Sequence, residues 1–281
     1  MPELPEVEHL RRSLEPALVG TRIESVRVRR RSVVSRGEAG LERALLAGAT
    51  ICSTARRGKQ MALVAGDGRV LVVQLGMTGS VTIESGAHPR GAEARHRHVV
   101  WALESACRMV FRDPRRFGGL TAYPDEHALA LAWSALGPDA LHSKPAVLAR
   151  HLAQVLAGRL RPVKAALLDQ TVVAGIGNIY ADESLFAARI HPLRPAATIR
   201  ASEWDRLAQA IGKILARAAD EGGSTLRDYR DAFGRPGQAV QNHQVYGRSG
   251  EPCLNCSTAI GSIRLQGRTT AFCPCCQDLS T

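Results

Sequence analysis

The alternation of apolar and polar residues changes character several times along the chain. Apolar residues recur at helical spacing in residues 5–18, which predicts a helix close to the N-terminus. Strand-like patterns occupy residues 21–34, 61–64, 70–75, 81–83, 99–103 and 109–112, with a short helical pattern at 41–46. Gly66-Asp67-Gly68 has the composition of a hairpin turn between two of these strands. Up to about residue 124, the pattern therefore predicts a two-sheet β sandwich or barrel with a helix at its start.

Helical spacing dominates the next hundred residues. The patterns cover residues 126–136, 144–157, 162–170, 178–189 and 202–221. The longest begins at Ser202-Glu203 and ends before Gly222-Gly223, which are suitable residues for the two ends of a helix. Residues 223–245 are glycine-rich and polar, and residues 246–281 are short and rich in cysteine. The chain is thus predicted to be an α+β multidomain protein, with a β domain, a helical domain, a loop and a metal-binding tail.

The charge of the chain indicates the kind of partner it binds. The 281 residues include 37 Lys and Arg against 26 Asp and Glu, for a formal net charge of +11. Such an excess favours a polyanionic partner, nucleic acid first and an anionic membrane second. The sequence shows no signal-peptide pattern and no apolar run of membrane-spanning length. We therefore expect a cytoplasmic protein that can associate with the nucleoid.

The cysteines of the tail have the spacing of a zinc site. Cys253 and Cys256 form one CxxC pair, and Cys273 and Cys276 form a second pair sixteen residues later. Two such pairs can complete a tetrahedron of thiolates, and a site with four protein ligands is structural rather than catalytic. Cys275 is left as a spare thiol or an alternative ligand. A redox pair or scattered core cysteines would be the other interpretation, and the paired spacing argues against both.

Two features of the helical region and the tail could bind phosphate. The stretch Val172–Asn178 is rich in small residues and precedes a helical pattern, so its backbone N–H groups could face an anion. Arg264 and Arg268 lie between the cysteine pairs, where a zinc-held ribbon would have its tip. The alternatives are a helical hairpin that packs on glycine and a solvated turn. No GxxxxGK[ST] sequence occurs, which argues against a nucleoside triphosphate site.

Two loops of the β domain carry apolar residues beside arginines. Met77 lies between glycines in QLGMTG, and Phe117 directly follows two arginines in RDPRRFG. Each residue alone could fold back into the core. Together, in a basic protein, they suggest apolar wedges that enter a base stack while a base is flipped out. The segment RRGK, which ends at Lys59, adds a basic turn that could instead be merely solvated.

The N-terminal stretch MPELPEVE is only partly explained by a helix start. Pro5 suits the first turn of a helix, and Glu6 and Glu8 suit the positive end of the helix dipole. Pro2 and Glu3 lie ahead of that helix and have no structural reason to be there.

Taken together, these segments resemble the formamidopyrimidine-DNA glycosylase/endonuclease VIII family. The resemblance runs in order along nearly the whole chain, through PELPEVE, RRGK, QLGMTG, RDPRRFGG, LLDQTVVAGIGNIYADESLFAARIHP, GGSTLRDY, QVYGRSGEPC and GRTTAFCPCCQ. It implies an N-terminal β sandwich with flanking helices, a helix-two-turn-helix domain and a C-terminal zinc-finger β hairpin. It also implies a bifunctional enzyme that removes oxidised bases from double-stranded DNA and then cuts the abasic site.

The resemblance assigns roles to individual residues. Pro2, exposed once Met1 is removed, would be the nucleophile, and Glu3 would be the general acid. Glu6 would be a supporting acid, and Lys59 would contact the lesion nucleotide; Arg268 belongs with this catalytic group and also grips phosphate. The remaining DNA contacts would be Met77, Arg115 and Phe117, which fill the gap left by the flipped base, and His98, Arg116, Lys164 and Asn178. Cys253, Cys256, Cys273 and Cys276 would hold one structural Zn²⁺.

The chemistry of the reaction explains why an N-terminal proline is suitable. An α-amino group has a reference pKa of about 7.7–8.0, so it is partly deprotonated near neutral pH, whereas lysine would need a large shift. Attack of a secondary amine on C1′ gives an iminium, which acidifies the C2′ hydrogen and permits β-elimination and then δ-elimination. Glu3 can supply the proton for opening the sugar ring if burial against DNA raises its pKa.

Other interpretations differ in the base pocket or in the chemistry. PELPE and LGMTG favour the formamidopyrimidine branch and hence oxidised purines such as 8-oxoguanine and formamidopyrimidines. Residues 231–244 depart from the family, with Gln238 and Ala239 where members often carry an aromatic pair, so an enzyme for oxidised pyrimidines is one alternative. A non-catalytic zinc-ribbon protein that binds DNA damage is another. We expect domains at 1–125, 126–235 and 245–281, and a monomer, as suits an enzyme that scans DNA.

Overall fold

The chain forms two compact units in the computed structural model, which describes residues 2–35, 40–86, 95–224 and 229–279. The first unit contains Met1–Ala135 and Ala219–Gln238, and the second contains Leu136–Ala218 and Ala239–Thr281. The segment after the longest helix therefore returns to the N-terminal unit. Among the described residues, no helix is both long enough and apolar enough to cross a membrane.

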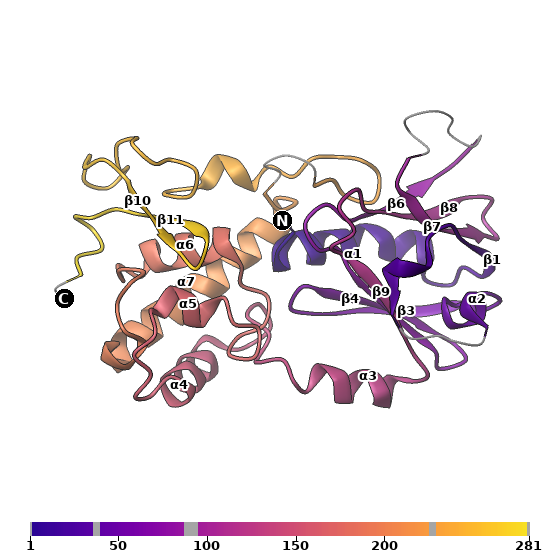
Figure 1. Ribbon diagram of the computed structural model, residues 1–281, viewed down its shortest axis with the longest axis horizontal. Coiled ribbons are helices and arrows are strands. Elements are labelled where there is room, and N and C mark those ends of the chain that lie inside the picture. The colour runs from indigo at the N-terminus through magenta and orange to yellow at the C-terminus, as the bar shows by residue number, and fades with distance from the viewer. Residues whose placement is uncertain (1, 36–39, 87–94, 225–228, 280–281) are drawn as a thin grey trace. The chain divides into compact units, whose positions relative to one another are not determined.

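Two sheets make up most of the first unit (Figure 1). The five-stranded sheet has the order β2 (Val34–Ser35), β9 (Gly119–Tyr123), β5 (Val70–Gln74), β4 (Gln60–Ala65) and β3 (Ile51–Arg57). The four-stranded sheet has the order β1 (Ile23–Val28), β7 (Arg97–Leu103), β8 (Arg108–Arg112) and β6 (Ser80–Glu84). Neighbouring strands are antiparallel except for the short β2–β9 pair. The expected two-sheet architecture is confirmed.

The core of this unit lies among the two sheets and helix α1 (Leu4–Leu18). Trp101 and Phe111 from the four-stranded sheet are fully buried in one apolar cluster with Leu14 of α1. Helix α1 also packs along β3 and β4. A returning residue, Ala232, joins the same cluster, and its carbonyl accepts a hydrogen bond of 2.8 Å from the backbone N–H of Ile83. The segment 219–238 is thus an integral part of the sandwich.

The sequence pattern located most of these elements. The hairpin expected at Gly66-Asp67-Gly68 joins β4 to β5, in which Val64 pairs with Val70. Strands β3 and β9 were not predicted, because β3 buries few of its side chains and β9 contains only one fully buried residue. The short helices here are α2 (Leu41–Ala44), α3 (Glu126–Trp133) and the 3₁₀ turn η1 (Arg31–Val33).

The second unit is helical and carries a β hairpin. Its α-helices are α4 (Pro145–Val155), α5 (Val163–Leu167), α6 (Asn178–Ala187) and α7 (Ala201–Asp220), with 3₁₀ turns η3 (Ala196–Thr198) and η4 (Ala239–Asn242). The hairpin consists of β10 (Gly261–Leu265) and β11 (Arg268–Phe272), and β11 packs beside α6 (Figure 1). Phe186 of α6 lies in one buried cluster with Ile260 and Cys273. This cluster fixes the tail to the helices.

Candidate active site and nucleic-acid interface

The residues ahead of helix α1 are held in a fixed position by the helix itself. Pro2 and Glu3 are buried, and the carbonyl of Glu3 accepts the first helical hydrogen bond, from the N–H of Val7 at 3.1 Å. The backbone N–H of Glu3 donates to Oε2 of Glu6 at 2.7 Å. This bond uses an N–H group that a helix start leaves without a backbone partner. The expected nucleophile, Pro2, therefore precedes a residue whose backbone N–H and carbonyl are both hydrogen-bonded to helix α1.

Glu6 also binds a segment that is remote in the sequence. Its Oε1 accepts a hydrogen bond of 2.6 Å from the backbone N–H of Ser224, and its carbonyl accepts one of 2.8 Å from the hydroxyl of Tyr229. Gly223 has φ of +76°, and a Cβ there would lie 2.7 Å from the Glu6 carboxyl group. Glycine is thus required both for the backbone conformation and for the close approach. A single carboxylate joins the N-terminus to the returning segment.

A buried ion pair supports the turn that carries Lys59. Glu8 lies on α1, and its Oε2 accepts a hydrogen bond from Nε of Arg56 at 2.9 Å, while Arg56 also donates to the carbonyl of Gly58 at 3.0 Å. Burial opposes ionisation of Glu8, but hydrogen bonds from Arg11 and Arg56 outweigh it and lower its pKa to about 2. The RRGK segment is therefore anchored to α1, a contact that the sequence did not reveal.

The three residues expected to fill the gap in DNA lie on two adjacent loops of the first unit. Met77 is 40% exposed and Phe117 is 57% exposed, so neither folds back into the core. The guanidinium of Arg115 stacks over the ring of Phe117, with 4.6 Å from Cζ to the ring centroid. Large apolar side chains exposed beside a cation form a surface suited to stacked bases.

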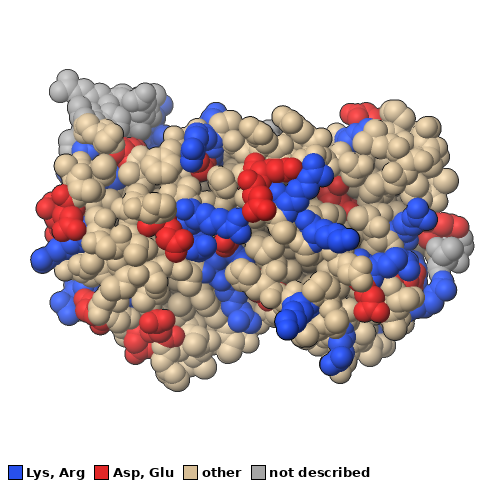
Figure 2. Space-filling model, turned by 180° about the vertical axis from the view of Figure 1, so that it is seen from behind, with Lys and Arg blue, Asp and Glu red and all other residues tan. Residues whose placement is uncertain are grey.

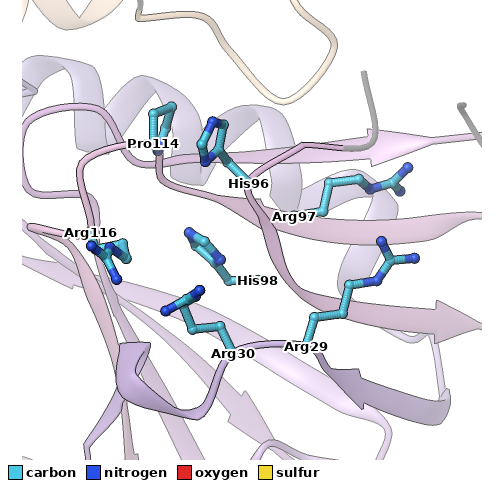
Figure 3. A pocket seen from close by; sticks show the side chains of 7 residues that line it. All are labelled: Arg29, Arg30, His96, Arg97, His98, Pro114 and Arg116. Carbon is cyan, nitrogen blue, oxygen red and sulfur yellow. The ribbon is translucent and has the colours of Figure 1, made fainter. Parts of the chain in front are cut away.

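A basic pocket of about 460 Å³ lies beside these loops (Figure 3). It is lined by Arg29, Arg30, His96, Arg97, His98, Pro114 and Arg116. Figure 3 shows the side chains of Arg30, His98 and Arg116 pointing toward one another. His98 is buried, and its Nε2 lies 2.8 Å from the carbonyl oxygen of Asp113, whereas His96 is exposed. His98 was among the expected DNA contacts and His96 was not, although both histidines stand in the same RHRH run.

The second unit brings two other expected phosphate contacts close together. Asn178 is the first residue of α6, and its side-chain amide donates to the carbonyl of Thr269 at 2.9 Å. Thr269 follows Arg268, which is exposed at the start of β11. The start of helix α6 and the arginine of the hairpin therefore lie on the same part of this unit.

Lys164, expected to contact DNA, lies in the interior of the second unit. Its side chain is fully buried, with Nζ 2.7 Å from Oδ1 of Asp182 and 2.8 Å from the hydroxyl of Thr270. Burial raises the pKa of Asp182 to about 6, with Lys164 acting in the opposite direction. Oδ2 of Asp182 accepts a hydrogen bond from the N–H of Ala271 at 3.0 Å. Lys164 and Asp182 together connect the helices to β11.

The four predicted zinc ligands converge. The sulfur atoms of Cys253, Cys256, Cys273 and Cys276 all lie within 4.8 Å of one another, with 3.9 Å between Cys253 and Cys276 and 3.4 Å between Cys256 and Cys273. Zn–S bonds of about 2.3 Å in a tetrahedron require sulfur atoms about 3.8 Å apart. The donor set therefore fits one structural Zn²⁺. Cys275 is exposed and outside this group.

Basic side chains are spread over the surface rather than confined to these sites. Figure 2 shows Lys and Arg side chains interspersed with Asp and Glu on one face. The net charge of +11 therefore acts as a general attraction for a polyanion.

Three models of known protein families match successive parts of the chain. Residues 1–120 match the formamidopyrimidine-DNA glycosylase N-terminal domain, residues 136–230 match its H2TH domain, and residues 250–279 match a zinc finger found in FPG and IleRS. The combination defines a class of DNA glycosylases that carry a helix-two-turn-helix domain and a zinc finger. Relatives and solved structures place the chain more closely.

The chain belongs to the formamidopyrimidine-DNA glycosylase family. It is 42% identical over 280 residues to the formamidopyrimidine-DNA glycosylase of Laribacter hongkongensis, covering 99% of this chain and 100% of that protein. It is 44% identical over 265 residues to that of Moorella thermoacetica, covering 94% and 95%. The structure of Lactococcus lactis Fpg in complex with DNA containing an abasic site matches with a TM-score of 0.88, 34% identity, and coverage of 99% of this chain and 100% of that one.

Proposed function

We propose that this protein is a bifunctional DNA glycosylase and abasic-site lyase of base excision repair, acting on oxidised purines in double-stranded DNA. The observation that carries the proposal is the N-terminal arrangement. Pro2 and Glu3 precede α1, and the Glu6 carboxylate holds both the N–H of Glu3 at 2.7 Å and the N–H of Ser224 at 2.6 Å. Glu3 also caps the start of helix α1, but a protein that only binds DNA has no use for an N-terminal proline beside that acid.

In this proposal the amine of Pro2 is the nucleophile after Met1 is removed. Its lone pair forms a bond to C1′ of the everted nucleotide, and the glycosidic bond breaks with its electrons leaving on the base; the bonded nitrogen then loses its proton and the departing base takes one up. Glu3 donates a proton to the sugar ring oxygen as the ring opens. The resulting iminium accepts electrons when the C2′ proton is removed, so the bond to the 3′ phosphate breaks. Repetition of the elimination releases the 5′ phosphate.

Glu6 and Lys59 act around this centre. Both carboxylate oxygens of Glu6 accept backbone N–H groups, so we assign it to positioning Glu3 and the glycine segment. Lys59 follows the turn that the buried Glu8–Arg56 pair anchors, and it contacts the lesion nucleotide in this scheme. A fixed approach of the reacting groups is worth several orders of magnitude in rate.

The DNA is held by separate sets of residues in each unit. Met77, Arg115 and Phe117 fill the space left by the everted base, and the basic pocket that includes His96 binds backbone phosphate of the duplex. Asn178 and Arg268 grip phosphate from the second unit. Each phosphate neutralised by a cationic side chain releases counterions, so these contacts make binding dependent on salt.

Zinc has a structural part in this scheme. When bound to the four cysteines it holds the hairpin that carries Arg268, and a site with four protein ligands leaves no position for a substrate. In this scheme Pro2 acts at C1′ and Glu3 acts at the ring oxygen of the sugar. The buried apolar cluster of the tail is small, so we expect zinc to contribute much of the folding free energy of this segment.

Relatives suggest the range of lesions. Lactococcus lactis Fpg has been seen in complexes with DNA containing Fapy-dG and with DNA containing an oxidised pyrimidine, in structures 33% identical to this chain with TM-scores of 0.88 and 0.87. We propose oxidised purines as the main substrates of this protein and oxidised pyrimidines as minor ones. We also propose that it acts on the chromosome in the cytoplasm.

The proposal is tested by excision from a panel of duplexes with defined purine and pyrimidine lesions, with borohydride trapping in parallel. We expect release of 8-oxoguanine and formamidopyrimidine, strand cleavage, and a covalent adduct after reduction. Pro2→Gly should greatly reduce trapping, whereas Pro5→Ala, which changes the helix start alone, should retain it. Undiminished trapping by Pro2→Gly would show that another residue is the nucleophile. DNA binding by the wild type without excision would identify a non-catalytic damage-binding protein.

A further inference from the structure

We propose that Asp113 is the positioning residue that makes the Met77 loop and the Phe117 loop act as one rigid wedge. The inference rests on the proposed function, in which these loops fill the gap left by an everted base. It adds a residue that neither contacts the base nor stands at the tip of a loop. Asp113 is fully buried directly behind both loops, at the end of strand β8.

The carboxylate of Asp113 bonds to both loops at once. Its Oδ1 accepts a hydrogen bond of 2.5 Å from the hydroxyl of Thr78, next to Met77. Its Oδ2 accepts one of 2.7 Å from the backbone N–H of Gly118, next to Phe117. The two oxygens of one side chain therefore fix the residue after Met77 and the residue after Phe117.

Thr78 closes the arrangement. Its hydroxyl oxygen accepts a hydrogen bond of 3.1 Å from the backbone N–H of Arg115, and Oδ1 of Asp113 lies 3.3 Å from the same N–H. The position of Arg115, whose guanidinium stacks on Phe117, is thus tied to the loop that carries Met77. Asp113 is fully buried and Thr78 is half-buried, so loss of the Thr78 hydroxyl leaves a buried carboxylate with one hydrogen-bond partner fewer.

The backbones of the two loops are in direct contact at glycines. A Cβ on Gly76 would lie 2.4 Å from the nitrogen of Gly118, and a Cβ on Gly118 would lie 2.5 Å from the carbonyl oxygen of Gln74. Such contacts allow one loop no movement without the other, provided the carboxylate keeps them together. The side chain of His98 also contacts Asp113, because its Nε2 lies 2.8 Å from the backbone carbonyl oxygen of Asp113. We therefore assign His98 to the support of the wedge.

A wedge made of two loops must be assembled before it can replace a base. If the loops moved independently, ordering them against DNA would cost conformational entropy at the moment of eversion. This entropy cost raises the free energy of the step in which a stacked, paired base leaves the DNA duplex. It falls much less on a preformed abasic site, where no base has to be unstacked.

The experiment compares two variants at Thr78, because replacement of the buried Asp113 itself could prevent the protein from folding. Thr78→Val keeps the shape and removes the hydroxyl, whereas Thr78→Ser keeps the hydroxyl and is the matched control. Asp113→Asn is measured alongside. For each purified full-length protein, excision of 8-oxoguanine from a paired duplex is compared with strand cleavage at a preformed abasic site in the same sequence. A 2-aminopurine beside the lesion reports unstacking.

We expect Thr78→Val and Asp113→Asn to reduce excision about tenfold or more, as loss of hydrogen bonds to a buried carboxylate implies. Cleavage of the abasic site should change by less than about twofold, the 2-aminopurine signal should fall, and Thr78→Ser should behave as the wild type. An equal loss in both reactions, or no loss, overturns the inference. Absence of 8-oxoguanine excision by the wild type instead refutes the proposed function, which keeps the two failures distinct.

Discussion

The buried pair of Glu8 and Arg56 provides the sharpest prediction about stability. Glu8→Gln keeps the size of the side chain but removes the charge that faces three arginines. The side chain of Arg56 is fully buried and that of Glu8 is 4% exposed, so the guanidinium would lose its counter-charge in a poorly solvated place. Breaking such a pair from one side costs about 3–5 kcal/mol.

The lowered pKa of Glu8 gives a second value for the free energy that the pair contributes to folding. The difference between its ordinary value of 4.5 and about 2 in the folded protein corresponds to about 3 kcal/mol of stability. For a unit of this size, that loss lowers Tm by about 6–12 °C. The carboxylate stabilises the fold fully above its unfolded pKa. Its contribution is lost as pH falls from about 4.5 toward about 2, so the difference between wild type and variant should shrink in that interval.

The matched control is Glu15→Gln on the same helix. Glu15 also pairs with Arg11, at 2.9 Å, but its side chain is 43% exposed. Water compensates such a pair, and we expect a change of less than about 1 kcal/mol. Thermal unfolding followed by circular dichroism at several pH values measures both variants. Equal melting of the two variants, or a Glu8→Gln deficit that persists unchanged in acid, would refute the reasoning.

Four further predictions concern the active site, the hairpin and the interior of the second unit. Gly223→Ala should abolish most excision while DNA binding persists, because a Cβ 2.7 Å from Glu6 forces that carboxylate to move; trapping and affinity measured together check this. Removal of zinc by a chelator should weaken DNA binding, and Arg268→Ala should reduce the salt dependence of binding by about one phosphate contact; an unchanged slope would exclude that contact. Lys164→Met should destabilise the second unit by about 3–5 kcal/mol. Denaturant unfolding should show a smaller deficit below the pKa of Asp182, which burial raises to about 6, than above it; an equal deficit would contradict the pairing.

Features that depend on local spacing could be predicted from the sequence. The two CxxC pairs predicted four sulfur atoms that do converge, and the periodicity of residues 5–18 predicted helix α1. Met77 and Phe117 were expected at loop tips, and they are exposed there. In each case the signal and the structure lie within a few residues of one another.

Features that depend on distant partners could not be predicted in this way. The family resemblance implied a DNA contact for Lys164, but its side chain is buried and pairs with Asp182 and with Thr270, which is 106 positions away. Likewise, Glu6 binds Ser224 across 218 positions. The pattern of apolar and polar residues in these segments does not indicate such a contact, because each partner taken alone is an ordinary polar residue.

The return of Ala219–Gln238 to the first unit has a consequence for the order in which the protein can fold during synthesis. The strands of the first unit leave the ribosome early, yet Ala232 of their core and the N–H of Ser224 that binds Glu6 are made more than two hundred residues after Glu6. The β sandwich therefore stays incomplete while the intervening helices are translated. The groups proposed to carry out the reaction would come into place only when nearly the whole chain exists, so a prematurely terminated chain would lack a competent nucleophile.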